Sequence, residues 1–170
     1  MTSRLGNGDN RQGVDERMKS LLLIGLLAAG CSSSYIPNTE VEDNAPNRRV
    51  ISFCEDYRHA IEDKNITKIL AMASPQYHED ASTPSGEDDI DYEGLRAFLT
   101  GLFTHTTQIR YEIKYKKVTF AESGHIWVDY TYAASYKLPG TKGDEWRHSV
   151  SDNRLDLVAD GEGFKIISGM

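Results

Sequence analysis

The chain has 170 residues and a net charge of −7, from 19 basic and 26 acidic side chains. This acidic excess excludes the classes of protein that need clustered Lys and Arg, above all nucleic-acid binders, because phosphates demand a basic surface. About 140 residues follow the apolar stretch near the N-terminus, which is the length of one ordinary domain. The sequence therefore predicts a short N-terminal signal followed by a single domain, with no nucleic-acid partner.

The apolar stretch is typical of an export signal. Lys19 precedes nine uncharged residues, Leu21–Ala29, and this run is too short for a helix that spans a bilayer, which needs about 20. It ends in small residues, the last of them Gly30, directly before Cys31, as expected at a cleavage site. The acidic residues before Met18 do not suit a signal, so we expect translation to start at Met18.

The sequence Ala28-Ala29-Gly30-Cys31 resembles the lipobox of bacterial lipoproteins. In that family a peptidase cuts before the cysteine, and acyl chains on the cysteine anchor the protein to the membrane. The resemblance implies a signal peptide over residues 1–30, cleavage after Gly30 and lipidation of Cys31. Ser32 occupies the position directly after the cysteine. In that family an aspartate at this position favours retention in the inner membrane, so the serine implies the outer membrane, facing the periplasm. An ordinary cleaved signal and a buried helix that contains a cysteine are the alternatives.

Residues 31–47 are rich in serine, proline and acidic side chains, a composition that predicts a flexible tether behind the lipidated cysteine. The domain is predicted over residues 48–170. Cys54 is the one other cysteine. It lies on the apolar stripe of a predicted helix, which favours a buried core thiol over a redox or catalytic one.

Three helices are expected from apolar residues that recur every three to four positions, over Arg48–Asp63, Ile66–Ala73 and Tyr92–Thr104. Asp91 is a candidate N-cap for the third. The acidic segment between the second and third helices, residues 76–91, could bind calcium. It lacks the spacing and the glycine turn of an EF-hand loop, so a solvated loop is the preferred interpretation.

From Gln108 onward apolar residues alternate with polar ones, which predicts strands. The phase slips at Lys116-Lys117, which predicts a β-bulge, and it slips again near Asp152-Asn153. Residues 126–136 keep one phase, and Phe164–Ile167 forms the last strand. Three helices followed by a four-stranded antiparallel meander predict an α+β fold.

This order of elements resembles the NTF2-like (SnoaL-like) family over about Val50–Gly169. The residues that carry the resemblance are Tyr57–Asn65, Pro75–Asp80, Gly94–Phe98 and Arg154–Ile166. The family fold implies a curved four-stranded sheet that wraps around three helices and leaves a cone-shaped apolar cavity. Members include isomerases, dehydratases and proteins with no known activity, so the fold does not assign a chemistry.

Five residues are predicted to surround that cavity: Tyr57, Phe98, Tyr130, Tyr132 and His148. Tyrosines would give an apolar wall with hydroxyls that can hold a ligand oxygen. In an enzyme, His148 would be the general base and Asp152 would orient it. The alternative is that His148 is a half-buried strand residue with a satisfied hydrogen bond. No metal-ligand spacing and no cofactor motif is present, so neither a metal nor a cofactor is expected.

Two functions are weighed. The first is a membrane-anchored envelope lipoprotein whose NTF2-like domain binds a small apolar ligand or a protein partner without catalysis. The alternative is an isomerase- or dehydratase-like enzyme that acts on a hydrophobic small molecule by proton transfer. The first is favoured because the sequence shows no acid–base pair. A homodimer through the outer sheet face is also expected, with Trp127 as an exposed aromatic.

Overall fold

The computed structural model of the chain describes residues 2, 34–80, 89–141 and 143–170. Residues 34–170 form one compact unit. Nearly all of the predicted signal peptide, including Gly30, lies outside the described residues, as do Cys31 and half of the acidic loop, residues 81–88. Within the described part, no helix has the length and apolar character needed to cross a membrane.

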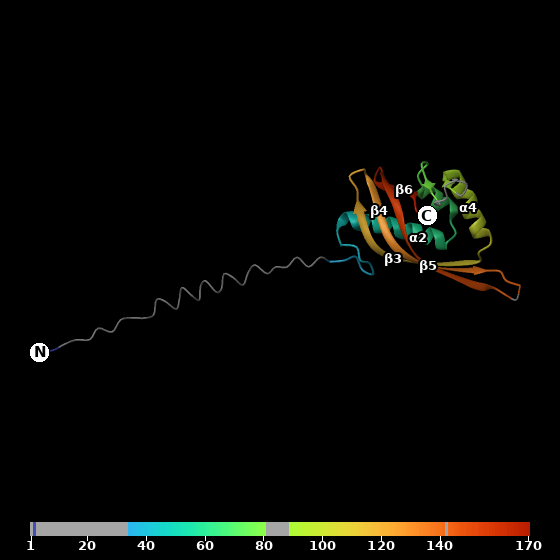
Figure 1. Ribbon diagram of the computed structural model, residues 1–170, viewed down its shortest axis with the longest axis horizontal. Helices are drawn as coiled ribbons and strands as arrows, with labels where there is room; N and C mark the ends of the chain where they lie inside the picture. The colour runs from blue at the N-terminus through green and yellow to red at the C-terminus, as the bar shows by residue number, and fades with distance from the viewer. Residues whose placement is uncertain (1, 3–33, 81–88, 142) are drawn as a thin grey trace. The chain divides into compact units, whose positions relative to one another are not determined.

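The sheet has four antiparallel strands in the order in which they occur along the chain, β3-β4-β5-β6. Figure 1 shows this meander, whose strands are β3 (Gln108–Phe120), β4 (His125–Leu138), β5 (Glu145–Asp160) and β6 (Gly163–Ser168). The predicted meander is therefore confirmed. A two-residue ladder between β1 (His78–Glu79) and β2 (Ile90–Asp91) was not predicted.

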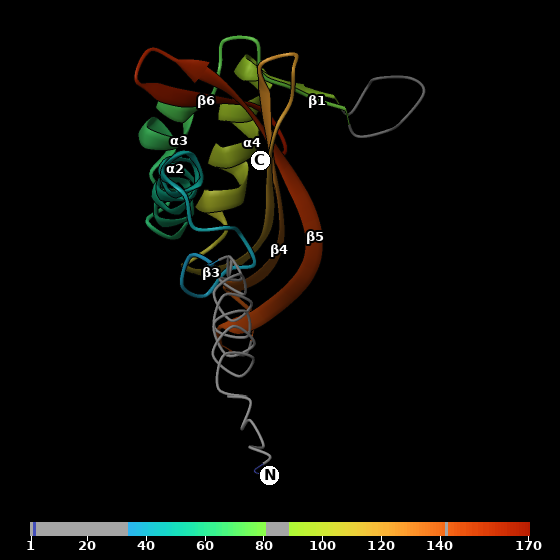
Figure 2. The ribbon, with the colours of Figure 1, turned by 90° about the vertical axis from the view of Figure 1, so that its left-hand side faces the viewer.

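Three helices cover the concave face of the sheet (Figure 2), namely α2 (Ala45–Glu62), α3 (Ile66–Met72) and α4 (Tyr92–Thr104). Helix α2 begins three residues earlier than predicted because the Asn44 side chain accepts a hydrogen bond from Asn47 N and Pro46 suits a first turn. Asp91 caps α4 as predicted. The hydrophobic core lies between these helices and the sheet and contains the fully buried Cys54.

The register of β3 against β4 shifts between Tyr115 and Lys117, which confirms the predicted bulge. The register of β4 against β5 is continuous, so the slip predicted near Asp152-Asn153 is wrong. Because side chains alternate along a strand, the residues of β5 that share the concave face with Tyr130 include Ser149, Ser151 and Asn153, together with the buried Leu155 and Leu157. The convex face takes Trp146, His148 and Val150.

The segment Ser34–Asn44, predicted to be flexible tether, is instead part of the folded domain. Val41 is only 2% exposed. Ile36 N donates to Val41 O at 2.9 Å, and Glu40 N donates to Tyr115 O of β3 at 2.9 Å. The composition of the segment suggested disorder, but one buried valine and hydrogen bonds to the sheet edge are enough to fix it.

This correction predicts that Val41 contributes to stability. In the fragment Ser34–Met170, Val41→Ala should lower the free energy of unfolding by about 1.5–3 kcal/mol, because it removes buried methyl groups and leaves a cavity. Val150→Ala is the matched control, since Val150 is 71% exposed and its truncation should cost less than about 0.5 kcal/mol. Urea denaturation measures both. Equal effects would show that the segment does not pack on the domain.

Candidate functional site

A cavity of about 210 Å³ lies between α2, α4 and the sheet. Its lining is mostly aromatic and aliphatic, and it consists of Tyr57, Ile61, Leu95, Phe98, Leu99, Leu102, Tyr111, Tyr132, Tyr136, Asn153 and Met170. We call this space the tyrosine cavity. Three of the five predicted pocket residues, Tyr57, Phe98 and Tyr132, line it, although they come from two helices and a strand.

The helices present these residues through their regular spacing. Tyr57 and Ile61 lie one turn apart on α2, and both are buried. Phe98 and Leu102 have the same spacing on α4, and Phe98 is 49% exposed. Phe98 therefore lies where the cavity meets solvent, while Tyr57, 2% exposed, lies deep inside.

Tyr130 supports the cavity without lining it. Its side chain is 1% exposed, and its ring centroid lies 6.4 Å from that of Tyr132. Asn153 Nδ2 donates to the Tyr130 hydroxyl and to Gly169 O, both at 3.1 Å. The Tyr130 hydroxyl donates to Gly169 O at 3.4 Å. The predicted residue Tyr130 thus holds the C-terminal residues against the sheet.

Gly169 cannot be another residue without rearrangement. Its φ is +91°, and a Cβ atom there would lie 1.9 Å from Arg154 O. Gly169 N also donates to the Glu79 carboxylate. Glycine is the residue that tolerates both the positive φ and the close approach to β5. This tight crossing puts Met170 in the cavity wall.

His148 and Asp152, the predicted acid–base pair, lie outside the tyrosine cavity. The exposed His148 is hydrogen-bonded through Nδ1 to Ser135 Oγ at 2.8 Å. Asp152 pairs with Lys116 Nζ at 2.7 Å, and Lys116 holds the pKa of that carboxyl below its usual range. The prediction placed both residues wrongly because it assumed a phase slip in β5 that the continuous register excludes.

The cavity contains polar groups, but its lining residues include no Asp, Glu, Lys, Arg or His. Burial raises the pKa of Tyr57 and of Tyr136, so both hydroxyls stay protonated at neutral pH. Burial also raises the pKa of Tyr111, and the Tyr111 ring stacks on that of Tyr132 with centroids 5.6 Å apart. The site can therefore offer neutral hydroxyl groups in an apolar space.

The sequence prediction named none of the other eight lining residues. Tyr111 and Tyr136 follow the alternation that identified Tyr132, so this signal could have found them. Asn153 was hidden by the assumed phase slip. The approach of Met170 depends on the close packing of Gly169 against β5, which no sequence pattern reveals.

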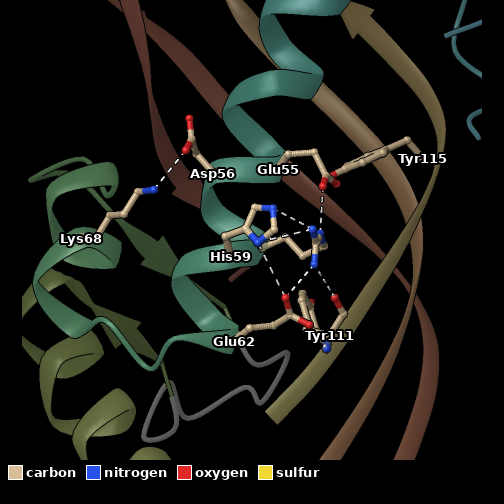
Figure 3. Close-up of polar contacts among 8 residues, drawn as sticks. Glu55, Asp56, His59, Glu62, Lys68, Tyr111 and Tyr115 are labelled. Atoms are coloured by element: carbon tan, nitrogen blue, oxygen red, sulfur yellow. Dashed lines mark hydrogen bonds and ion pairs between the residues drawn. The ribbon is translucent and has the colours of Figure 1, made fainter. Parts of the chain in front are cut away.

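A polar cluster on the other side of α2 joins this helix to the edge strand β3 (Figure 3). Arg58 Nε donates to Glu55 Oε2 at 2.9 Å, and Arg58 Nη1 donates to Glu62 Oε2 at 2.8 Å. Glu62 Oε1 accepts from Tyr111 N at 3.0 Å, and Glu55 Oε1 accepts from the Tyr115 hydroxyl at 2.9 Å. These charges are paired, so the cluster positions Tyr111 and Tyr115.

A larger groove of about 420 Å³ lies between the segment Ile36–Thr39, α2 and β3. Its walls include Glu55 and Arg58, which are already paired with each other. The tyrosine cavity is the stronger candidate because its hydroxyls of Tyr57, Tyr132 and Tyr136 have no hydrogen-bond partner among the described residues. Among the same residues, no group of three or more side chains could hold a metal ion.

Trp127, on the outer face of the sheet, is less exposed than predicted. Its ring is only partly exposed, since the Arg154 guanidinium lies 5.5 Å from the ring centroid. An ion pair between Arg154 Nε and Asp129 Oδ1, 2.7 Å apart, holds the guanidinium in place. The exposed apolar residue of this face is Val150, and the homodimer through this face stays a prediction.

No protein-family model matches the chain, and no curated protein matches it by sequence. Solved structures match it by fold. Kfla4162 from Kribbella flavida has a TM-score of 0.61 at 16% identity, over 72% of this chain and 86% of that one. A protein named as a putative dehydratase of the NTF2-like family, from Streptomyces avermitilis, has a TM-score of 0.61 at 10% identity, over 72% and 92%. Aln2 from a Streptomyces species has a TM-score of 0.55 at 14% identity, over 75% and 90%.

These likenesses extend over most of the matched chains, and their low identities establish the fold alone. The domain has the α+β NTF2-like fold, with three helices against a four-stranded antiparallel sheet. The predicted fold class is confirmed.

The buried tyrosines predict a loss of stability in alkali. Burial raises the pKa of six of them above the ordinary value of about 10, namely Tyr57, Tyr77, Tyr111, Tyr115, Tyr130 and Tyr136. Above pH 10 the unfolded chain loses protons that the folded domain retains. Stability should therefore be complete below about pH 10 and should fall as the pH rises, by up to about 1.4 kcal/mol per pH unit for each tyrosine.

Urea denaturation of Ser34–Met170 between about pH 9 and 11 measures this loss. Tyr115→Phe should make the decline shallower, whereas Tyr35→Phe, at a residue 59% exposed, should leave the slope unchanged. A free energy of unfolding that stays constant over this range would contradict the burial of the tyrosines.

Proposed function

We propose that the chain is a lipid-anchored bacterial envelope protein whose NTF2-like domain binds a small, mostly apolar ligand in the tyrosine cavity, without catalysis. The observation that carries the binding role is a cavity of about 210 Å³ with an apolar wall and a few unpaired hydroxyl groups. Binding sites for small molecules have this composition, in which apolar side chains supply most of the affinity and a few polar groups fix orientation.

Binding is favoured over catalysis by the charge of the lining. An isomerase or dehydratase that moves a proton needs an acid or base within hydrogen-bond reach of its substrate. The described lining offers tyrosine hydroxyls and one amide, and the Asn153 amide is already bonded to Tyr130 and Gly169. The enzyme alternative is supported by two structural neighbours that are named as putative dehydratases, and those names describe the neighbours and not this chain.

The anchor is supported by the sequence Ala28-Ala29-Gly30-Cys31 behind a short apolar run. The compact domain begins at Ser34, so only Ser32 and Ser33 separate Cys31 from it in the sequence. Two residues give little reach. An acylated Cys31 would therefore keep the domain at the membrane surface, in place of the longer tether that composition suggested. The outer membrane, facing the periplasm, is the location that Ser32 favours.

Replacing the anchor cysteine tests the localisation. Cys31→Ser in the full chain should abolish acylation and release the protein from carbonate-washed membranes, because each buried methylene of the acyl chains contributes about 0.8 kcal/mol to anchoring. Cys54→Ala is the control, since Cys54 is buried in the core and its loss should leave acylation intact. Labelled palmitate incorporation and membrane fractionation are the measurements. A Cys31→Ser protein that stays with the membranes would refute the anchor.

Toluene tests the binding role. At ten times its dissociation constant, toluene should stabilise the fragment Ser34–Met170 by about 1.4 kcal/mol and raise its Tm by roughly 4–6 °C. Leu102→Trp should abolish the rise, because the larger ring would fill the cavity that Leu102 lines. Phe120→Trp, in a separate groove, should keep it. Absence of any rise in the unmodified domain would refute binding in the tyrosine cavity.

A further inference from the structure

The tyrosine cavity contains donors that have no acceptor. The hydroxyl groups of Tyr57, Tyr132 and Tyr136 line the cavity and make no hydrogen bond to any residue in the described part of the chain. Tyr57 is the deepest of the three, with 2% of its surface exposed. None of the three hydroxyl oxygens is among the fully buried, unpartnered atoms of the described residues, so each is accessible from the cavity. The three hydroxyls therefore offer hydrogen bonds to a molecule that occupies the cavity.

The polar side chains beside these hydroxyls are already hydrogen-bonded to other groups. Asn153 Oδ1 accepts from Arg154 N at 2.8 Å, and Asn153 Nδ2 donates to the Tyr130 hydroxyl and to Gly169 O. Apart from the tyrosines, the other lining side chains are hydrocarbon or thioether. The side-chain hydrogen-bonding capacity that remains includes the hydroxyls of Tyr57, Tyr132 and Tyr136, which can donate to a ligand.

The same lining disfavours a charged ligand. No lining residue is a Lys, Arg or His that could pair with a carboxylate or phosphate, and none is an Asp or Glu that could pair with an ammonium group. The desolvation free energy lost on burying an unpaired ion is far larger than the stabilisation that a hydrogen bond from a neutral hydroxyl provides. The nearby Arg58 is already held by Glu55 and Glu62.

The volume limits the size of the ligand. An engineered apolar cavity of about 150 Å³ in another protein holds benzene, and the tyrosine cavity has about 210 Å³. One ring with a short substituent fills such a space. The exposed edge at Phe98 would allow a longer apolar tail to leave the cavity.

We propose that the tyrosine cavity selects an uncharged molecule of about one ring that carries an acceptor oxygen, such as an aryl ketone, ester or ether. The oxygen accepts from the hydroxyls of Tyr57, Tyr132 and Tyr136, and the ring packs against the aliphatic side chains of α4. This selection rests on the proposed binding function and deepens it by naming the ligand chemistry.

Three probes of similar size test the selection by calorimetry on Ser34–Met170. Acetophenone carries the acceptor, α-methylstyrene has the same shape with a CH₂ group in place of the oxygen, and benzoate is an anion. Acetophenone and α-methylstyrene should both bind, and benzoate should bind at least about 100-fold more weakly than acetophenone. Equal affinity for benzoate would overturn the claim that the ligand is uncharged.

Tyrosine-to-phenylalanine variants isolate the hydrogen bond. At least one of Tyr57→Phe, Tyr132→Phe and Tyr136→Phe should weaken acetophenone about 3- to 10-fold relative to α-methylstyrene, which corresponds to one neutral hydrogen bond. Tyr92→Phe is the control, since the Tyr92 hydroxyl donates to Leu70 O outside the cavity, and it should leave this ratio unchanged. An unchanged ratio in all three cavity variants overturns the acceptor proposal. If neither neutral probe binds the unmodified domain, the binding function fails instead.

Discussion

The attachment of α2 to the edge strand β3 is the constraint on which the rest of the domain depends. An edge strand leaves backbone groups unpaired, and here α2 satisfies those of Tyr111, since Glu62 accepts from its N–H and Arg58 donates to its carbonyl at 3.3 Å. Lys64 adds a bond to Thr106 O at 2.8 Å. With α2 fixed across the concave face, Tyr57 must face Tyr111 and Tyr132, and the space between them becomes the tyrosine cavity.

The bulge between Tyr115 and Lys117 separates two functions of the same strand. Before it, Tyr111 lines the cavity. At the bulge, Tyr115 O accepts from Glu40 N and the Tyr115 hydroxyl donates to Glu55, so the N-terminal segment and α2 meet the strand at one residue. Because a bulge bends its strand and strengthens the twist, it also helps the sheet to curve around the helices.

Much of this could be predicted from the sequence, since the helices and β4 have strong periodicity and their buried faces follow from it. The phase of β5 could not. Its first half carries Trp146 and Val150, which look like core residues, yet Ser149 and Ser151 share the concave face with Tyr130. Residues of this half are largely exposed on both faces. Because neither face is buried, the positions of its apolar residues do not show which face points toward the core. The prediction of a flexible tether failed for another reason. The composition of the segment is typical of disorder, but the burial of one residue, Val41, fixes it to the domain.

The position of His148 shows why a fold does not assign a chemistry. Proton transfer in such a cavity needs an acid or a base that faces into it, and one step of strand phase moves a histidine from the cavity wall to solvent. In this chain the residue of β5 that lies beside the cavity on the concave face is Asn153. Its side-chain NH₂ group already donates hydrogen bonds to the Tyr130 hydroxyl and to Gly169 O. The polarity that remains in the cavity belongs to tyrosine hydroxyls, which carry no charge at neutral pH. Under the proposed binding function, such a site would discriminate ligands by their shape and by the placement of one oxygen.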